Sequence, residues 1–156
     1  MRAVVQRVSR AVVRVGDETV GEIGAGLCVL VAVTHTDGPA QAGRMAAKLA
    51  NLRLFDDGDA VMNRSVVEAG GDVLVVSQFT LYGDTRRGRR PSWSAAAPGD
   101  HARPLVEGVV AGLRELGLNV ATGAFGADMN VELVNHGPVT VIVDVPDEKS
   151  VDLDRS

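Results

Sequence analysis

Two hydroxyl side chains and an amide stand together in Ser77-Gln78-Phe79-Thr80, at the end of a predicted strand that begins at Asp72. A strand fixes the groups at its end while the following loop opens to solvent, an arrangement common in catalytic sites. Backbone N–H groups at such a place can also stabilise the oxyanion of an acyl-transfer reaction. On spacing alone, an ordinary strand with alternating polar residues that ends in a turn also explains the segment.

A second candidate site is Gly137-Pro138, which lies between two runs of strand-forming residues, Asn130–Val134 and Val139–Val145. About 5–6% of X–Pro bonds are cis, and these favour tight turns. A cis bond here would display the Gly137 carbonyl in an unusual direction. Local sequence by itself favours an ordinary hairpin turn, and it leaves the isomer open.

Four arginines crowd a long irregular stretch of an otherwise acidic protein, whose formal net charge is −4. They are Arg86, Arg87, Arg89 and Arg90. Such a cluster can bind phosphates in a salt-sensitive way. The alternative is a solvated loop whose arginines pair with Asp84 and neighbouring acids. Because the chain as a whole is acidic, we expect no general binding to polyanions and no binding to DNA.

Several functional classes lack their sequence signature. The histidines are scattered and there is a single cysteine, Cys28, which predicts a small buried hydrophobe and no metal site. No phosphate-binding glycine loop and no G-x-S-x-G elbow occur, so we expect no cofactor. Arginines interrupt the apolar residues of the N-terminal segment, and no apolar run approaches the ~20 residues of a spanning helix. We therefore expect a cytoplasmic protein with no membrane partner.

The order of the strands and helices expected around these residues predicts an α+β protein with a mostly antiparallel sheet and two main helices. Apolar residues at helical spacing indicate one helix near Ala42–Leu52 and another near Leu105–Leu116. The other apolar runs are rich in β-branched residues, which favours strands. We expect a single domain over residues 1–145 and a disordered tail over 146–156.

The chain resembles the D-aminoacyl-tRNA deacylase family, also called D-tyrosyl-tRNA deacylases, from its N-terminus to about Val145. The similarity includes MRAVVQRVSRAVVRV, GEIGAGLCVLV, MNRSVVEAGGDVLVVSQFTLYGDTRRGRRPSW and ATGAFGADMNVELVNHGPVTVIVDV. Neither SQFTL nor NHGPVT is specific alone. Both motifs in this order, in a chain of this length, make the resemblance strong.

The resemblance implies an enzyme that hydrolyses the ester of D-aminoacyl-tRNA, and of mischarged glycyl-tRNA. It implies a barrel-like fold and a homodimer whose active sites lie at the subunit interface. Each site would combine Ser77–Thr80 of one subunit with the Gly137-Pro138 turn of the other, which is cis in the family. Main-chain oxygens of this turn would clash with an L side chain and let D side chains and glycine pass.

Other residues take roles by the same resemblance. Arg7 matches an arginine that holds the turn, and Phe125 and Met129 match positions that line the adenosine pocket. Thr80 matches a residue once proposed as nucleophile. It has no evident base, so we favour catalysis assisted by the 2′-OH of the tRNA. The arginine cluster would contact tRNA phosphates.

The sequence departs from the family at two positions, where His136 replaces the more common Asp and Trp93 replaces Phe.

Two other interpretations compete with the enzyme. One is a non-catalytic nucleic-acid-binding module that uses the arginine cluster. The other is an assembly protein whose strands form a dimer sheet, which would leave both motifs without a role.

Overall fold

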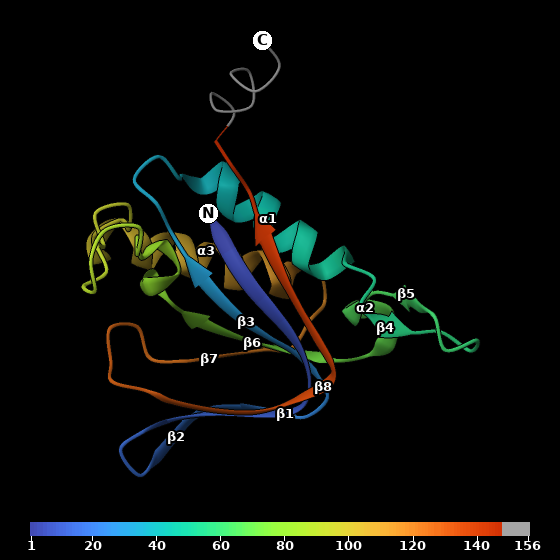
Figure 1. Ribbon diagram of the computed structural model, residues 1–156. Helices are drawn as coiled ribbons and strands as arrows, with labels where there is room; N and C mark the ends of the chain where they lie inside the picture. The colour runs from blue at the N-terminus through green and yellow to red at the C-terminus, as the bar shows by residue number, and fades with distance from the viewer. Residues whose placement is uncertain (148–156) are drawn as a thin grey trace.

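The computed structural model describes residues 1–147 and shows the elements of Figure 1. The strands are β1 (Arg2–Val15), β2 (Glu18–Ile23), β3 (Gly26–Ala32), β4 (Phe55–Asp56), β5 (Met62–Arg64), β6 (Asp72–Ser77), β7 (Val120–Thr122) and β8 (Asn130–Asp144). The helices are α1 (Pro39–Asn51), α2 (Val66–Ala69), the 3-10 helix η1 (Phe79–Tyr82) and α3 (Gly99–Glu115). Most of the predicted tail, residues 148–156, lies outside the described residues.

The main sheet is mixed, whereas the sequence predicted a mostly antiparallel one. Its strand order is β2-β1-β3-β6-β7, with β8 paired to β1. Strand β1 pairs antiparallel with β2, β3 and β8, but β3–β6 and β6–β7 are parallel. The reason lies in the connections. Helices α1 and α3 each return the chain to the edge where the previous strand began, so the next strand must run parallel to it.

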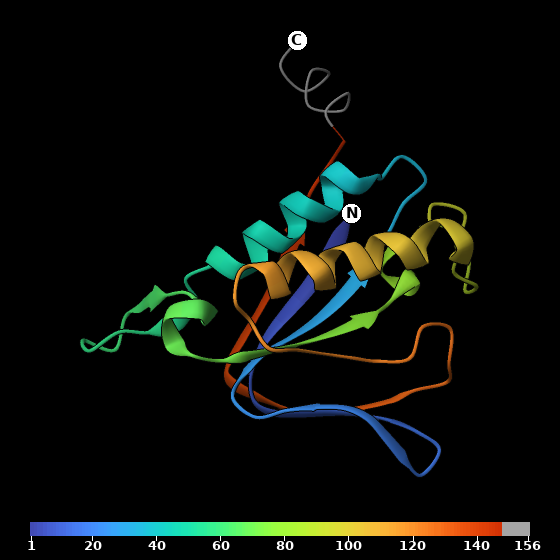
Figure 2. The ribbon, with the colours of Figure 1, turned by 180° about the vertical axis from the view of Figure 1, so that it is seen from behind.

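The sheet curls until its ends nearly meet, as Figure 2 shows. Strand β2 begins the strand order and β7 ends it. A Cβ built on Gly21 of β2 would lie 2.3 Å from the carbonyl oxygen of Thr122 in β7. This close approach makes the sheet a nearly closed barrel, in agreement with the barrel-like fold that the resemblance implied.

Helices α1 and α3 lie together on one face of the sheet (Figures 1 and 2). Alternate residues of the central strands point to opposite faces, and both faces are covered. Leu27 and Val73 pack toward the helices in the larger hydrophobic cluster, while Cys28 and Leu74 join a smaller cluster inside the barrel. This double burial explains why β3 and β6 read as continuous apolar runs. Burial of Cys28 confirms its prediction as a small hydrophobe.

Strand β8 is continuous over 15 residues, whereas the sequence predicted two strands joined by a turn. Strand β1 pairs with it along nearly its whole length, with register shifts between Gln6 and Arg10. The Gly137-Pro138 segment is therefore a local irregularity within one long strand and not the tip of a hairpin. Within residues 1–147, no helix combines the length and the apolar character needed to cross a membrane.

Candidate active site

The polar segment after β6 leaves the sheet at the end of a buried strand. Strand β6 ends at Ser77, and the backbone N–H of Gln78 donates to the carbonyl oxygen of Val31 in β3 at 2.7 Å. The chain then turns into the short helix η1, which begins at Phe79. Gln78 is half-buried, whereas Phe79 and Thr80 are exposed. The central sheet therefore fixes the segment, and the turn presents it to solvent.

Two backbone N–H groups remain unbonded at the start of η1. The first amides of a helix have no partner within the helix, and here no capping side chain supplies one. Among the described residues, the backbone N–H groups of Phe79 and Thr80 have no hydrogen-bond acceptor. They are thus available to bind an oxygen of a substrate.

The hydroxyl of Thr80 is not linked to a base. Its oxygen accepts a hydrogen bond from the side-chain amide of Gln78. An amide donor stabilises the hydroxyl but cannot remove its proton. Within the described residues, Thr80 therefore lacks the base that a threonine nucleophile requires.

A cavity of about 250 Å³ opens beside this segment. Its walls come from the ends of β3 and β6, the first turns of α3 and the loop after β7. The lining residues are Val31, Ala32, Val33, Ser77, Gln78, Phe79, Ala97, Gly99, Ala102, Val106, Phe125 and Gly126. The cavity is mainly apolar, and its polar groups are gathered near Ser77 and Gln78, which suits a ligand with one reacting polar end.

Trp93 packs against Phe79 of the candidate site, although the sequence interpretation noted it only as a departure from the family pattern. Its ring meets that of Phe79 edge-on, with 5.6 Å between the centroids and 78° between the planes. This geometry is favourable for aromatic pairs. Trp93 thereby orients the exposed Phe79. The spacing of 14 residues between them gives no periodic signal, so sequence alone could not have linked the two.

Arg7 holds the Gly137-Pro138 segment from inside the fold. Its side chain is buried, and Nε donates to the carbonyl oxygen of His136 at 3.2 Å. Nη1 donates to the carbonyl oxygen of Leu54 at 2.9 Å. The peptide bond between Gly137 and Pro138 is cis, and both residues are exposed. The sequence expectation that Arg7 and this turn lie together thus agrees with the geometry.

Asn135 closes the base of the same turn, a role that sequence reasoning did not assign. Its amide nitrogen donates to the carbonyl oxygens of Arg7 and Val139, each at 3.0 Å. The amide therefore spans both strands where their register shifts. An asparagine two positions before Gly-Pro was the available signal.

The turn and the Ser77 segment of one chain lie far apart. Strands β1 and β3 stand between β8 and β6, which places about 14 Å of sheet between them at the usual strand spacing. Along the strands, Arg7 is level with Leu27 and Val73, four residues before Ser77 and so a further ~13 Å away. A single chain does not bring its two motifs together.

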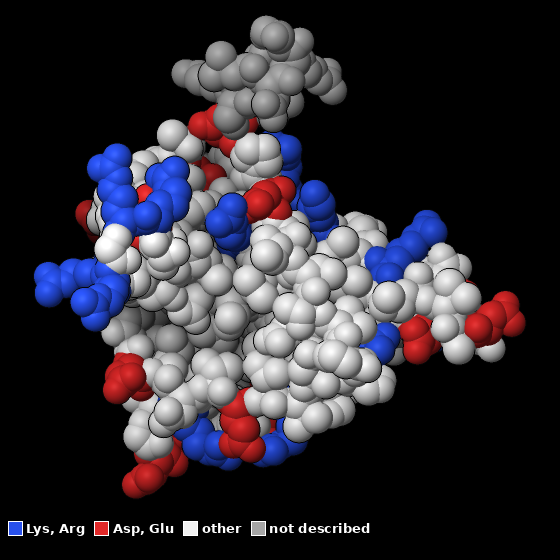
Figure 3. All heavy atoms as spheres, in the orientation of Figure 1, with Lys and Arg blue, Asp and Glu red and all other residues white. Residues whose placement is uncertain are grey.

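The arginine cluster lies on the exposed loop between η1 and α3 (Figure 3). Arg86 pairs with Asp84 at 2.7 Å, and the bonds from Arg86 hold the pKa of that carboxyl at about 2. Among the described residues, Arg87, Arg89 and Arg90 make no hydrogen bond or ion pair. Three guanidinium groups are thus available to an anionic ligand, and the fourth is already paired.

The two residues matched to the adenosine pocket take different places. Phe125 lines the cavity beside Ser77, and the guanidinium carbon of Arg103 lies 4.9 Å from the centre of its ring. Met129 packs against the small cluster inside the barrel, beside Gly123. The structure thus brings Phe125 to the cavity, whereas Met129 packs inside the barrel, against the loop that contains Phe125.

Comparison with known proteins identifies the family of this chain. A family model described as D-Tyr-tRNA(Tyr) deacylase matches residues 4–144. The chain belongs to this family. The match covers both the Ser77–Thr80 segment and the Gly137-Pro138 turn.

Relatives of the D-Tyr-tRNA(Tyr) deacylase family include a protein from Thermus aquaticus named D-aminoacyl-tRNA deacylase. It is 57% identical over 144 residues, which are 92% of this chain and 95% of the relative. A solved structure named c-Myc DNA Unwinding Element Binding Protein is 37% identical, with a TM-score of 0.88, and covers 94% of this chain and 100% of its own. A structure described as a probable eukaryotic D-amino acid tRNA deacylase shares the fold at 18% identity, with a TM-score of 0.79 over 92% of this chain and 98% of its own.

Proposed function

We propose that this protein hydrolyses the ester between a D-amino acid and the terminal adenosine of tRNA, and likewise the ester of mischarged glycyl-tRNA. The observation that carries the proposal is the pair of backbone N–H groups, at Phe79 and Thr80, that find no acceptor among the described residues and lie beside an apolar cavity in a member of the deacylase family. A carbonyl oxygen that becomes an oxyanion during ester hydrolysis needs such donors. An enzyme of this kind works where charged tRNA is, in the cytoplasm.

The chemistry uses the substrate's own hydroxyl together with water. Water adds to the ester carbonyl carbon, the bond to the 3′ oxygen breaks, and this oxygen leaves with a proton. The neighbouring 2′-OH of the ribose takes part in this proton transfer, because Thr80 lacks a base among the described residues. The N–H groups of Phe79 and Thr80 hold the oxyanion, and Phe125 contacts the adenosine. Arg87, Arg89 and Arg90 contact phosphates of the tRNA.

Selection against L-amino acids falls to the Gly137-Pro138 turn of a second subunit. In one chain the turn is too distant from Ser77 to act there, so a partner must supply it. Its main-chain oxygens would leave no room for an L side chain, whereas a D side chain or a hydrogen points elsewhere. The hydrogen bonds from Arg7 and Asn135 hold the turn rigid, and a rigid turn is needed if a steric clash is to exclude L side chains.

Strand β8 supplies the surface on which the second copy docks. One edge of β8 pairs with β1, and no described strand pairs with its other edge. Its exposed apolar side chains include Val134 and Ile142, and Figure 3 shows a broad uncharged surface over this strand. A long edge strand with exposed apolar residues is prone to pair with another chain. The homodimer we propose uses this strand.

The deciding experiment offers the purified protein D-tyrosyl-tRNA and L-tyrosyl-tRNA in parallel. We expect rapid release of D-tyrosine and no release of L-tyrosine above the uncatalysed rate. Equal rates for the two substrates, or no hydrolysis of either, would refute the proposal.

The turn is tested with Gly137→Ala. Gly137 has φ of +127°, and an added Cβ would lie 2.8 Å from Cγ2 of Val139. Such strain, about 1–3 kcal/mol, displaces the turn, so we expect kcat/KM for D-tyrosyl-tRNA to fall at least about tenfold. Gly16→Ala is the matched control, since Gly16 also has a positive φ, of +58°, but no atom of the described part of the chain lies within 4 Å of its added Cβ. An unchanged ratio of D to L hydrolysis and an unchanged rate in Gly137→Ala would contradict the role of the turn.

A second candidate function is binding of DNA without hydrolysis. It is favoured by the name of the 37% identical structure, a DNA unwinding element binding protein, and by Arg87, Arg89 and Arg90, which have no partner within residues 1–147. The net charge of −4 opposes it. Titration with single-stranded DNA and with uncharged tRNA separates the two functions. Tight DNA binding without deacylation would favour this candidate.

A further inference from the structure

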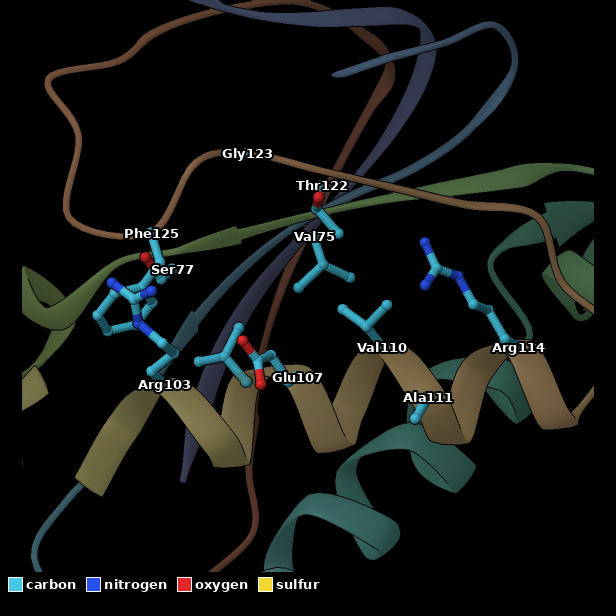
Figure 4. Close-up of a pocket in the computed structure, with 11 residues that line it drawn as sticks. Val75, Ser77, Arg103, Glu107, Val110, Ala111, Arg114, Thr122, Gly123 and Phe125 are labelled. Carbon is cyan, nitrogen blue, oxygen red and sulfur yellow. The ribbon is translucent and has the colours of Figure 1, made fainter. Parts of the chain in front are cut away.

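A second cavity, of about 370 Å³, continues from the candidate active site along α3 (Figure 4). It lies between the exposed side of this helix and the strands β6 and β7. Ser77, Val106 and Phe125 line both cavities, so the two form one continuous depression. A ligand larger than the terminal aminoacyl-adenosine would extend into this second cavity, which the proposed chemistry leaves unused.

Three charged side chains of α3 project into this cavity in sequence. Arg103, Glu107 and Arg114 line it, and the spacing of four and seven residues places them on one side of the helix. About 16 Å of helix separates the first from the last. Figure 4 shows Arg103 at the end near Ser77 and Phe125, Arg114 at the far end, and Glu107 between them.

The hydrogen bonds of these side chains show which of them are open to a ligand. Arg114 donates to the carbonyl oxygen of Val120, and Arg103 lies over the ring of Phe125. Glu107 is exposed, and within residues 1–147 it has no hydrogen bond or ion pair. A carboxylate between two guanidinium groups, yet paired with neither, is placed to accept a hydrogen bond from a ligand.

The sequence of charges along the cavity, with Arg103 next to Glu107, suits a nucleotide. Arginine attracts a phosphodiester, whereas a carboxylate repels one and accepts a hydrogen bond from an exocyclic amine of a base. Among pyrimidines only cytosine carries such an amine, at N4, while uracil presents an oxygen acceptor there. In tRNA the nucleotide before the terminal adenosine is a cytidine.

We propose that this cavity binds the cytidine that precedes the terminal adenosine of tRNA, with Glu107 accepting a hydrogen bond from its N4 amine. The phosphodiester that joins the two nucleosides lies at the junction of the cavities, beside Arg103. This inference rests on the proposed function and adds to it a base-specific subsite. The protein thereby reads one nucleotide upstream of the reacting ester.

The test uses hydrolysis-resistant mimics in which an amide joins D-tyrosine to the 3′ position. The mimics carry adenosine alone, cytidylyl-adenosine or uridylyl-adenosine, and their dissociation constants are measured by calorimetry. For the unmodified protein we expect the cytidylyl mimic to bind about tenfold more tightly than either of the others. That ratio is typical of one hydrogen bond to a charged acceptor.

Glu107→Gln isolates the carboxylate. An amide both donates and accepts, so this variant should bind the cytidylyl and uridylyl mimics within about twofold of each other, with the affinity for the adenosine mimic unchanged. Glu115→Gln is the matched control, since Glu115 is exposed on the same helix and does not line the cavity. We expect it to retain the full preference for cytidine.

The outcomes separate the subsite from the proposed function. Equal affinity of the unmodified protein for cytidylyl and uridylyl mimics, or a preference that survives in Glu107→Gln, would overturn the subsite alone if D-tyrosyl-tRNA is still hydrolysed. Failure of every mimic to bind, with no hydrolysis of D-tyrosyl-tRNA, would overturn both.

Discussion

Thr80 illustrates how one hydrogen bond bears on a mechanism. Its hydroxyl accepts from Gln78, and no described residue is placed to take its proton. If the substrate's 2′-OH assists the reaction, Thr80→Ala should keep kcat/KM for D-tyrosyl-tRNA within roughly fivefold, since solvent replaces the lost acceptor. A threonine nucleophile would instead lose about three orders of magnitude or more. Thr80→Ser is the control, because it preserves a hydroxyl. If that hydroxyl is the nucleophile, Thr80→Ser should retain the activity that Thr80→Ala loses; if the 2′-OH assists the reaction, both variants should remain active.

Cys28 couples burial to pH dependence. Burial raises the pKa of its thiol to about 11, so the folded protein retains a proton that the unfolded chain loses at lower pH. Stability from this group is complete below the unfolded pKa, near 9, and falls as pH rises toward 11. In the unmodified protein, titration of this thiol should lower the free energy of unfolding by about 2–3 kcal/mol over this pH range. We expect this decrease to be absent in Cys28→Ala.

Urea unfolding of the two proteins between pH 8 and 11 measures this difference. Tyr82, whose pKa burial raises to about 12, contributes equally to both proteins and cancels. Parallel pH curves for the two proteins would show that the thiol does not titrate differently on folding.

At the scale of elements, a buried ion pair joins the residue before β1 to the segment before α1. The amino group of Met1 lies 2.7 Å from a carboxylate oxygen of Asp37, just before α1, and both groups are buried. The same amine donates to the carbonyl oxygen of Val145, and His101 of α3 contacts the carbonyl oxygen of Asp37. This cluster ties β1, the residue after β8, α1 and α3 together.

Asp37→Ala would leave the amine buried without its counter-charge. Removal of one partner of a buried pair costs about 3–5 kcal/mol, and we expect that loss in the free energy of unfolding measured with urea. Thr36→Ala, at an exposed neighbouring position, should change it by less than about 0.5 kcal/mol. A loss below 1 kcal/mol in Asp37→Ala would mean that water reaches the amine.

At the scale of the whole molecule, the distance between its two motifs demands a second copy. This can be tested by mixing two defective variants. Phe79→Pro removes a backbone N–H from the oxyanion site, and Gly137→Ala disturbs the turn. A heterodimer of the two holds one site with both parts intact. In a random mixture, half of the dimers are heterodimers, and each of these has one intact site out of two. About a quarter of the unmodified activity should therefore return.

Phe79→Pro alone should show about one per cent of the unmodified activity or less, and Gly137→Ala alone at most about a tenth. Sedimentation of the mixture checks that dimers form. Absence of recovery in a mixture of confirmed heterodimers would show that each chain uses its own turn.

The sequence by itself determined what depends on neighbours along the chain. Apolar residues at helical spacing predicted α1 and α3, and β-branched runs predicted the central strands. The motifs around Ser77 and Gly137 marked the family. The predictions of the helices, the strands and the family succeeded because periodicity and motif spacing are local properties of the chain.

Tertiary structure alone decided which distant segments meet. It set the parallel pairing of β3 with β6, the continuity of β8, and the contacts of Arg7 and Trp93, which link positions far apart in the chain. It also joined Glu107 to the cavity beside Ser77. Strand pairing and cavity walls depend on which elements pack together. The periodic pattern of an element shows which of its faces is buried but not which other element covers that face.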